Sequence, residues 1–273
     1  MAKENPLASN LTLEQQKNLF GNAYLNMLWH CPTDQRFPYW VHLPDCYYDE
    51  KDPHYKLLVI IHGTGCAVED YVRHAKELAD RDHVAVLAPL FPGGLIQRDD
   101  FNSYKLLSCD GVRYDQILLD MIDDMAKRYP GVETDKFFLF GHSGGGQFVN
   151  RFLFAHPEKL RACAIGAPGR PTFLNPDEDY FWDTRDFKNF FGHDVDLAAV
   201  QKVPVLVIVG ENDTKFIGDS PYGDNRVARM KSLQKNLQDH GVHTELTILP
   251  GFAHEGGEKE RVQAAQHFFE AYL

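Results

Sequence analysis

The sequence has little that would point to a metal site, a disulfide framework or a membrane segment. Its five cysteines are odd in number and widely spread, and no two of them form a C-x-x-C pair. That spacing disfavours both a disulfide scaffold and a zinc site, and it favours reduced thiols. No apolar run approaches the roughly 20 residues that a membrane-spanning helix needs. We therefore expect no metal, no disulfide and no membrane partner.

Positive charge is also scarce. The chain has 28 Lys and Arg against 39 Asp and Glu, which gives a formal net charge of −11. This balance argues against a nucleic-acid backbone or an anionic membrane surface as partner. Residues 1–6 lack the apolar stretch of a secretory signal. We expect a cytoplasmic protein with a small-molecule substrate, and the sequence does not decide between a monomer and a homo-oligomer.

Apolar, β-branched runs alternate with helix-compatible segments along most of the chain. The clearest run, Leu-Leu-Val-Ile-Ile at 57–61, is typical of a strand buried on both faces of a parallel sheet. A strand at 36–43, which Pro44 ends, precedes it and is expected to be antiparallel. Further strands are expected at 84–88, 136–140, 161–165, 203–209 and 244–249, with helices at 69–81, 115–129, 147–155, 225–239 and 258–272.

This alternation predicts an α/β fold with a doubly wound, mostly parallel sheet, formed by a single domain over 1–273. Two segments, 89–114 and 168–201, do not fit the alternation, and connections of that length are commonly functional. The second is rich in aromatic residues, and we interpret it as a small cap or lid over the substrate. The pocket aromatics expected from it and from the loop beyond are Phe173, Phe181, Trp182 and Phe216. The alternative is that the aromatics of the insertion only attach it to the body.

Ser143 stands in the pentapeptide Gly141-His142-Ser143-Gly144-Gly145, directly after the apolar run at 137–140 and before an expected helix. This is a G-x-S-x-G in the strand-turn-helix setting of a nucleophile elbow. Small residues on either side allow the chain to bend sharply and expose a hydroxyl that is otherwise a weak nucleophile. The pentapeptide alone also fits an ordinary glycine-rich turn. The assignment therefore depends on a base and an acid elsewhere in the chain.

Asp213 and His254 are the expected acid and base. A serine nucleophile needs a base within hydrogen-bond reach, and the base needs an acid that fixes its orientation. In chain order the acid should follow the serine and the histidine should come last. Asp213 comes directly after the strand at 203–209, and His254 comes shortly after the strand at 244–249. Parallel strands place these ends on the same sheet edge as Ser143.

Other polar residues compete for the same roles. Glu211 is a second carboxylate in the loop after 203–209, but the position of Asp213 matches the usual loop geometry better. His142 is a neighbour of the nucleophile and should point along a different direction, and His62 is expected to order its own loop. Cys66 lacks a neighbouring base in the sequence, which favours a packing role.

Acyl transfer also requires hydrogen-bond donors for the oxyanion of the tetrahedral intermediate. The backbone N–H of Gly144, directly after the nucleophile, is expected to be one donor. The second should come from the loop His62-Gly63-Thr64-Gly65, where small residues allow close approach to the substrate. Thr64 and Gly65 are both candidates.

Four motifs carry a family resemblance: HGTG at 62–65, GHSGGG at 141–146, GENDT at 210–214 and GFAHE at 251–255. Together the motifs resemble the α/β-hydrolase superfamily over residues 36–273, and within it the esterase and polyhydroxybutyrate-depolymerase-like branch. The resemblance implies an α/β-hydrolase fold and no metal or organic cofactor. It also implies a serine carboxylic-ester hydrolase that acts on a small ester-type substrate. The same triad serves amide, lactone and carbon–carbon bond cleavage, and a non-catalytic ligand-binding protein of this fold is the alternative from a different class.

Overall fold

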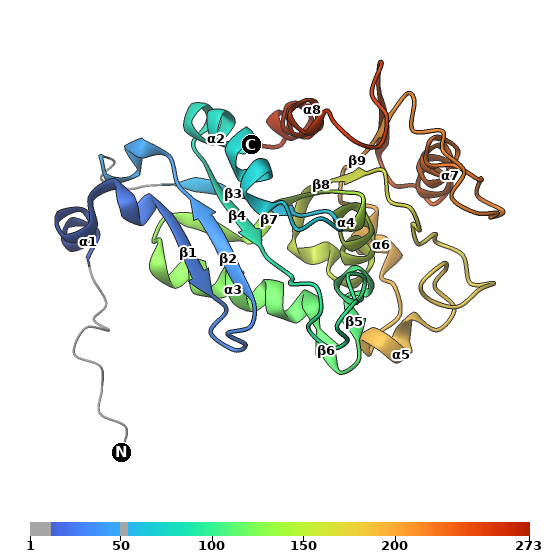
Figure 1. Cartoon of the computed structure of the whole chain (residues 1–273), viewed down its shortest axis with the longest axis horizontal. Helices are drawn as coiled ribbons and strands as arrows, with labels where there is room; N and C mark the ends of the chain where they lie inside the picture. The colour runs from blue at the N-terminus through green and yellow to red at the C-terminus, as the bar shows by residue number, and fades with distance from the viewer. Residues whose placement is uncertain (1–11, 50–53) are drawn as a thin grey trace.

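An eight-stranded sheet forms the centre of the protein, with the strand order β1-β2-β4-β3-β7-β8-β9-β10 (Figure 1). The structure is a computed structural model that describes residues 12–49 and 54–273. From β4 to β10 neighbouring strands run parallel, whereas β1 and β2 are antiparallel to their neighbours. The strands are β1 (Asn26–His30), β2 (Pro38–His42), β3 (Tyr55–Ile61), β4 (Val84–Pro89), β7 (Val132–His142), β8 (Leu160–Gly166), β9 (Val205–Gly210) and β10 (Thr244–Leu249).

Helices cover both faces of this sheet, each burying an apolar stripe. One face carries α2 (Val68–Asp82) and α8 (Glu258–Glu270), and the other carries α3 (Tyr114–Arg128), α4 (Gly144–Ala155) and α7 (Arg226–Asp239). In β3, Leu58 and Ile60 pack on the face covered by α2 and α8. Leu57, Val59 and Ile61 pack on the face covered by α3, α4 and α7. Both faces are therefore apolar, which is why the sequence of β3 is a continuous hydrophobic run. The expected doubly wound, mostly parallel sheet is confirmed.

The sequence did not predict every element. β1 pairs with β2 from Asn26 opposite His42 and forms the sheet edge, where its residues alternate between exposed and half-buried. An edge strand buries little apolar surface, so its sequence carries a weak signal. The remaining short elements are α1 (Leu13–Phe20), η1 (Gly21–Leu25), η2 (Asp45–Tyr48), η3 (Ser103–Leu106), β5 (Ser108–Cys109), β6 (Val112–Arg113), η4 (Pro157–Lys159), α5 (Phe187–Phe191) and α6 (Leu197–Val200).

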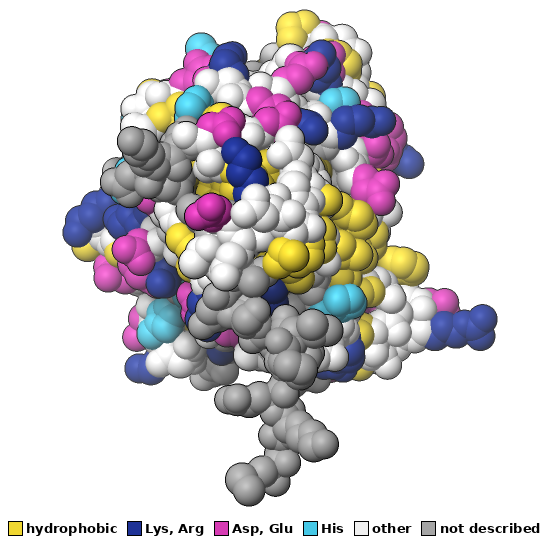
Figure 2. Space-filling model, turned by 90° about the vertical axis from the view of Figure 1, so that its left-hand side faces the viewer, with side chains coloured by type: hydrophobic (Ala, Val, Ile, Leu, Met, Phe, Trp, Pro, Cys, Tyr) yellow, Lys and Arg dark blue, Asp and Glu magenta, His cyan; other side chains and the backbone are white. Residues whose placement is uncertain are grey.

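Hydrophobic side chains gather on the face that carries α1 and β1 (Figure 2). Leu19, Phe20 and Leu28 are exposed apolar residues of these two elements. Residues 1–11, on which the expectation of no secretory signal rests, lie outside the described residues. Within residues 12–49 and 54–273, no helix has the length and apolar character needed to cross a bilayer.

The two irregular segments pack against each other. The hydroxyl of Tyr180, in the insertion 168–201, donates a hydrogen bond to the carbonyl of Leu106 in η3 at 2.7 Å. The guanidinium of Arg113 lies 5.3 Å from the ring centre of Phe191, and α5 lies beside the β5–β6 hairpin in Figure 1. The insertion 168–201 is therefore packed against residues of the segment 89–114.

Candidate active site

Ser143 occupies a sharp turn between β7 and α4. Its backbone has φ 57° and ψ −110°, a conformation that non-glycine residues rarely adopt. A β-carbon on Gly141 would lie 2.5 Å from the carbonyl carbon of Gly145, and one on Gly145 would overlap the carbonyl oxygen of Ile61. Only glycine fits at both positions. The two glycines thus allow the tight turn that exposes the Ser143 hydroxyl.

Asp213, His254 and Ser143 form a continuous hydrogen-bonded chain. His254 Nδ1 lies 2.7 Å from Asp213 Oδ2, and His254 Nε2 lies 2.9 Å from Ser143 Oγ. Because the carboxylate only accepts, Nδ1 carries the proton and Nε2 is the acceptor for the serine hydroxyl. The Asp213 side chain is 1% exposed, whereas that of His254 is 19% exposed. The arrangement can withdraw a proton from Ser143 while Asp213 stabilises the imidazolium.

The backbone of His254 is fixed from two sides. Arg261 Nη2 donates to the carbonyls of Ala253 at 2.8 Å and of His254 at 3.0 Å. His142 Nε2 also donates to the carbonyl of His254, at 3.2 Å. His142 is buried, and burial together with the charge of Arg261 lowers its pKa well below the usual value, so it stays neutral. His142 therefore supports the position of His254 and does not contact Ser143 Oγ.

His62 orders the loop after β3. Its Nε2 accepts a hydrogen bond from the Phe91 N–H at 2.9 Å, and its Nδ1 donates to the Gly63 carbonyl at 2.6 Å. Burial lowers the pKa of His62 to about 4, so the ring is neutral near pH 7. Both ring nitrogens are used in this way, which leaves none for proton transfer.

Glu211, the competing acid, binds the loop before His254, and the carboxylate that is hydrogen-bonded to His254 is that of Asp213. The Glu211 carboxylate accepts the N–H of Gly251 at 3.0 Å and is exposed to solvent. Cys66 packs near the Phe91 carbonyl, and burial raises the pKa of its thiol. Neither residue joins the hydrogen-bonded chain of Ser143.

The loop that offers the two candidates for the second oxyanion donor lies beside the elbow. A β-carbon on Gly144 would lie 3.2 Å from the backbone nitrogen of Thr64, so the two backbones approach closely. No heavy atom lies within 4 Å of a β-carbon built on Gly65. Gly63, Thr64 and Gly65 line a groove of about 190 Å³ together with Ser143 and His254. Both Thr64 and Gly65 therefore stay candidates for the second donor, and the Thr64 backbone nitrogen approaches Gly144.

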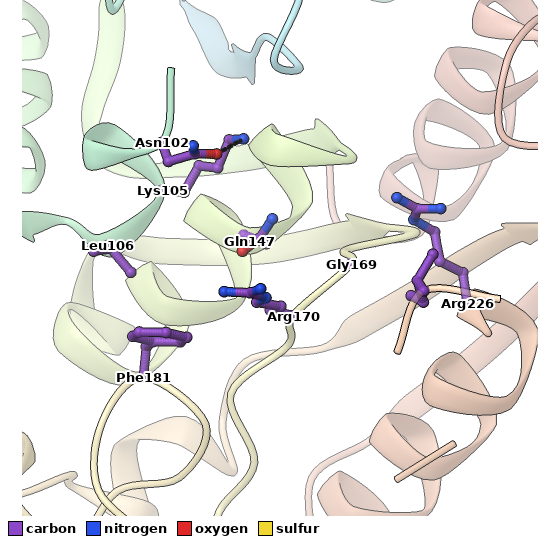
Figure 3. A pocket seen from close by; sticks show the side chains of 9 residues that line it. Asn102, Lys105, Leu106, Gln147, Gly169, Arg170, Phe181 and Arg226 are labelled. Atoms are coloured by element: carbon purple, nitrogen blue, oxygen red, sulfur yellow. Dashed lines mark hydrogen bonds between the residues drawn. The ribbon is translucent and has the colours of Figure 1, made fainter. Parts of the chain in front are cut away.

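A second cavity, of about 470 Å³, lies next to the elbow and is lined by cations (Figure 3). Three of its residues are Lys105, Arg170 and Arg226, and no Asp or Glu lines it. Arg226 Nη1 lies 3.5 Å from Asp213 Oδ1. Arg226 therefore contacts both this cavity and the carboxylate that binds His254. The full lining is Asn102, Lys105, Leu106, Gln147, Gly169, Arg170, Phe181, Ile217 and Arg226. Despite the net charge of −11, this cavity is lined by three cations, whereas the groove at Ser143 is also lined by Glu255 and Glu258.

The expected pocket aromatics have different positions. Phe181 lines the cationic cavity. Phe173 is completely buried and stacks on Tyr222 with 3.5 Å between ring centres, so it attaches the insertion to the body instead of facing a substrate. Trp182 packs under the guanidinium of Arg229 at 5.4 Å, and Phe216 is 62% exposed. The structure therefore brings only Phe181 of the four to a cavity beside Ser143.

Sequence reasoning missed the cations of this cavity. Lys105 and Arg170 lie in the two irregular segments, and Arg226 begins α7, so no motif marks any of them. The only available signal was the unusual length of 89–114 and 168–201. In the described part of the chain, no group of three or more His, Cys, Asp or Glu side chains is arranged to hold a metal ion.

The profile of the dienelactone hydrolase family matches residues 44–271. No curated protein sequence matches the chain. A poly(3-hydroxybutyrate) depolymerase from Bordetella parapertussis has a similar structure, with a TM-score of 0.73 at 19% identity, covering 98% of this chain and 97% of that one. These comparisons confirm the expected α/β-hydrolase fold.

Other solved hydrolases share the fold. Poly(aspartic acid) hydrolase-1 from Sphingomonas sp. KT-1 has a TM-score of 0.68 at 18% identity, covering 89% of this chain and 96% of that one. An S-formylglutathione hydrolase from Staphylococcus aureus has a TM-score of 0.61 at 18% identity, with 90% and 94% covered. At this identity the likeness is one of fold.

Proposed function

The chain belongs to the dienelactone hydrolase family, and from this premise we propose that it is a serine hydrolase that cleaves a carboxylic ester. The observation that carries the proposal is the hydrogen-bonded chain from Asp213 through His254 to Ser143 Oγ, with links of 2.7 and 2.9 Å. The strained turn at Ser143 supports it, because such strain persists at functional sites. The catalytic triad is thus Ser143, His254 and Asp213.

The reaction proceeds by acylation and hydrolysis. Ser143 Oγ attacks the acyl carbon while His254 Nε2 takes the hydroxyl proton, and the N–H groups of Gly144 and Thr64 stabilise the oxyanion. His254 then gives the proton to the leaving alcohol, and an acyl-enzyme remains on Ser143. Water, activated by His254 in the same way, attacks the acyl carbon and releases the acid.

The cationic cavity favours a substrate with an anionic group near the scissile ester. Lys105, Arg170 and Arg226 approach it from three different elements; no Asp or Glu lines the cavity, and of the three cations Arg226 is ion-paired with Asp213. Phe181 and Leu106 add an apolar wall, which suits a short carbon chain or a ring. A polyanionic substrate is also implied by the name of one protein of similar fold, the poly(aspartic acid) hydrolase.

A lactone is the nearest alternative substrate. It is a cyclic ester that the same triad opens, and the family description names one. Amide and carbon–carbon cleavage use the same groups and differ in pocket shape. A non-catalytic ligand-binding role is disfavoured by the complete chain of hydrogen bonds at Ser143.

A fluorophosphonate probe tests the enzyme assignment. We expect the probe to label Ser143 of the wild-type protein covalently and to leave Ser143→Ala unlabelled. Folded protein that resists labelling would contradict the proposal. Initial rates on p-nitrophenyl esters with neutral and carboxylated acyl groups, a lactone and an amide would then identify the substrate class. A preference for a neutral acyl group would exclude the anionic substrate but leave the serine hydrolase assignment intact.

A further inference from the structure

Lys105 is a buried lysine beside the elbow that the triad mechanism does not use. It lies in η3, and the residue is 6% exposed. Its Nζ atom donates to Thr64 Oγ1 at 2.8 Å and to Asn102 Oδ1 at 2.6 Å, the latter contact drawn in Figure 3. Both partners are neutral. Among the described residues, no carboxylate oxygen lies within 4.0 Å of this ammonium group.

The end of this side chain lies against the oxyanion donors. A β-carbon on Gly144 would lie 2.7 Å from Lys105 Cε and 3.2 Å from the backbone nitrogen of Thr64. The absence of a side chain at Gly144 therefore lets the lysine stem and the Thr64 backbone approach the same backbone segment. Lys105 Nζ thus binds the Thr64 hydroxyl, and Lys105 Cε lies beside the Gly144 backbone together with the Tyr104 hydroxyl.

The backbone of Lys105 is fixed as firmly as its side chain. Arg151, a completely buried residue of α4, donates from Nη1 to the Lys105 carbonyl at 2.5 Å. The same guanidinium donates from Nη2 to the carbonyl of Arg170 at 2.8 Å and from Nε to Thr172 Oγ1 at 3.1 Å. Since α4 begins directly after Ser143, Arg151 ties η3 to the helix that carries the nucleophile. A buried cation held in this way does not need to reorganise when charge develops nearby.

We propose that Lys105 is a positioning residue of the oxyanion site: it fixes Thr64 through the threonine hydroxyl and holds a positive charge beside Gly144 while the tetrahedral intermediate forms. This inference rests on the proposed serine hydrolase function. A preorganised charge in a site of low dielectric stabilises a developing oxyanion more than it stabilises the neutral substrate. The lysine should therefore act on the transition state.

The proposal makes a prediction about pH, because Lys105 is expected to change charge slightly above neutrality. Burial lowers the pKa of Lys105 to about 8, an effect that Asp100 and Cys66 oppose and Arg151 and Arg170 increase. Below pH 8 the ammonium form predominates, and above pH 8 it is lost. Burial raises the pKa of Tyr104 and Cys66, and the pKa of His62 is about 4, so these neighbours do not change charge near pH 8. The proposal therefore predicts an activity loss between pH 7 and 9.

Steady-state kinetics on p-nitrophenyl acetate test the proposal, because a neutral ester makes no use of an anion-binding cavity. At pH 7 we expect Lys105→Met to lower kcat/KM by about 10- to 100-fold, less than the loss of an oxyanion donor itself. Lys105→Arg, whose charge persists to high pH, should recover part of the activity and lose the decline between pH 7 and 9. Lys202→Met, which removes an exposed lysine, should keep the wild-type profile.

A double-mutant cycle tests the route through Thr64. Thr64→Val removes the hydroxyl that Lys105 binds but keeps the backbone N–H, and its effect should not add to that of Lys105→Met. Wild-type kcat/KM in folded Lys105→Met, or an unchanged alkaline decline in Lys105→Arg, would overturn the proposal. In either case fluorophosphonate labelling of Ser143 would persist, whereas failure of the proposed function would abolish labelling of the wild-type protein. A normal melting temperature of Lys105→Met excludes misfolding as the cause of a loss.

Discussion

Arg226 places Nη1 3.5 Å from Oδ1 of Asp213, and the other oxygen of that carboxylate binds His254. The Asp213 side chain is 1% exposed, and that of Arg226 is 17% exposed. One guanidinium therefore contacts the buried acid of the proposed triad and also lines the cationic cavity. Under the proposed function, Arg226 would therefore take part both in substrate binding and in the orientation of His254.

Replacement of the cavity arginines should separate these two roles. Arg170→Gln removes a cation that has no contact with the triad, so we expect KM for a carboxylated ester to rise about tenfold with kcat unchanged. Arg226→Gln should raise KM similarly and also lower kcat, because Asp213 loses its cation. Kinetics with a neutral ester provide the control, since only Arg226→Gln should affect it. Equal effects of Arg170→Gln on neutral and charged esters would contradict the anionic-substrate proposal.

The triad residues should act as a unit. Ser143→Ala and His254→Ala should each reduce kcat by roughly 10⁴- to 10⁶-fold, and the double variant should be no worse than either. Asp213→Asn should cost about 10⁴-fold, because an amide no longer stabilises the imidazolium or selects its tautomer. Glu211→Gln, whose carboxylate contacts only the Gly251 N–H in the loop, is the matched control and should retain activity. If the loss of kcat in the double variant equals the product of the two single losses, Ser143 and His254 act independently.

Glycine at the elbow should be indispensable for folding. A β-carbon on Gly145 would overlap the carbonyl oxygen of Ile61 and lie 2.8 Å from that of His62, and backbone atoms of a central strand cannot move aside. Gly145→Ala should therefore lose about 4 kcal/mol or more of unfolding free energy, or yield insoluble protein. Gly65→Ala meets no atom within 4 Å and should change stability by less than about 1 kcal/mol. Urea denaturation measures both, and equal effects would contradict this account.

His62 should contribute a pH-dependent part of stability. The folded protein holds it neutral with a pKa of about 4, below the usual 6.5, whereas the unfolded chain takes up a proton as the pH falls through 6.5. Its contribution is therefore complete above pH 6.5 and is lost as the pH falls to about 4, a change of about 3 kcal/mol. The difference in unfolding free energy between wild type and His62→Gln should shrink by that amount from pH 7 to pH 4. If this difference in unfolding free energy stays constant from pH 7 to pH 4, His62 is not the source of the pH-dependent stability.

Loss of the Arg261 hydrogen bonds should lower activity without making the triad side chains more accessible to solvent. Arg261 donates to the carbonyls of Ala253 and His254, so Arg261→Met should loosen the His254 loop and lower kcat by about tenfold or more. KM should stay near the wild-type value, because Arg261 lines neither cavity beside Ser143. Arg73→Met, at an exposed ion pair on α2, controls for the loss of charge. A changed KM with unchanged kcat would assign Arg261 a different role.

Much of the fold followed from the hydrophobic pattern, and the exceptions have physical causes. Strands buried on both faces, such as β3 and β9, are continuous apolar runs that no helix period explains. β1 was not predicted, because an edge strand of five residues buries too little surface to impose a hydrophobic pattern on its sequence. The aromatic insertion was expected to line a pocket with Phe173, whereas that ring fills the core against Tyr222. Composition does not specify the direction in which a loop side chain points.

The sequence by itself determined the sheet, the elbow and the loops that carry Asp213 and His254, because parallel strands bring their carboxyl ends to one edge whatever the details of packing. Only the tertiary structure decided that the Thr64 backbone lies beside Gly144, and that Lys105, Arg170 and Arg226 meet in one cavity. Those residues belong to irregular segments and a helix start, whose places depend on long-range contacts such as the one from Arg151 to the Lys105 carbonyl. Such contacts leave no periodic signal along the chain.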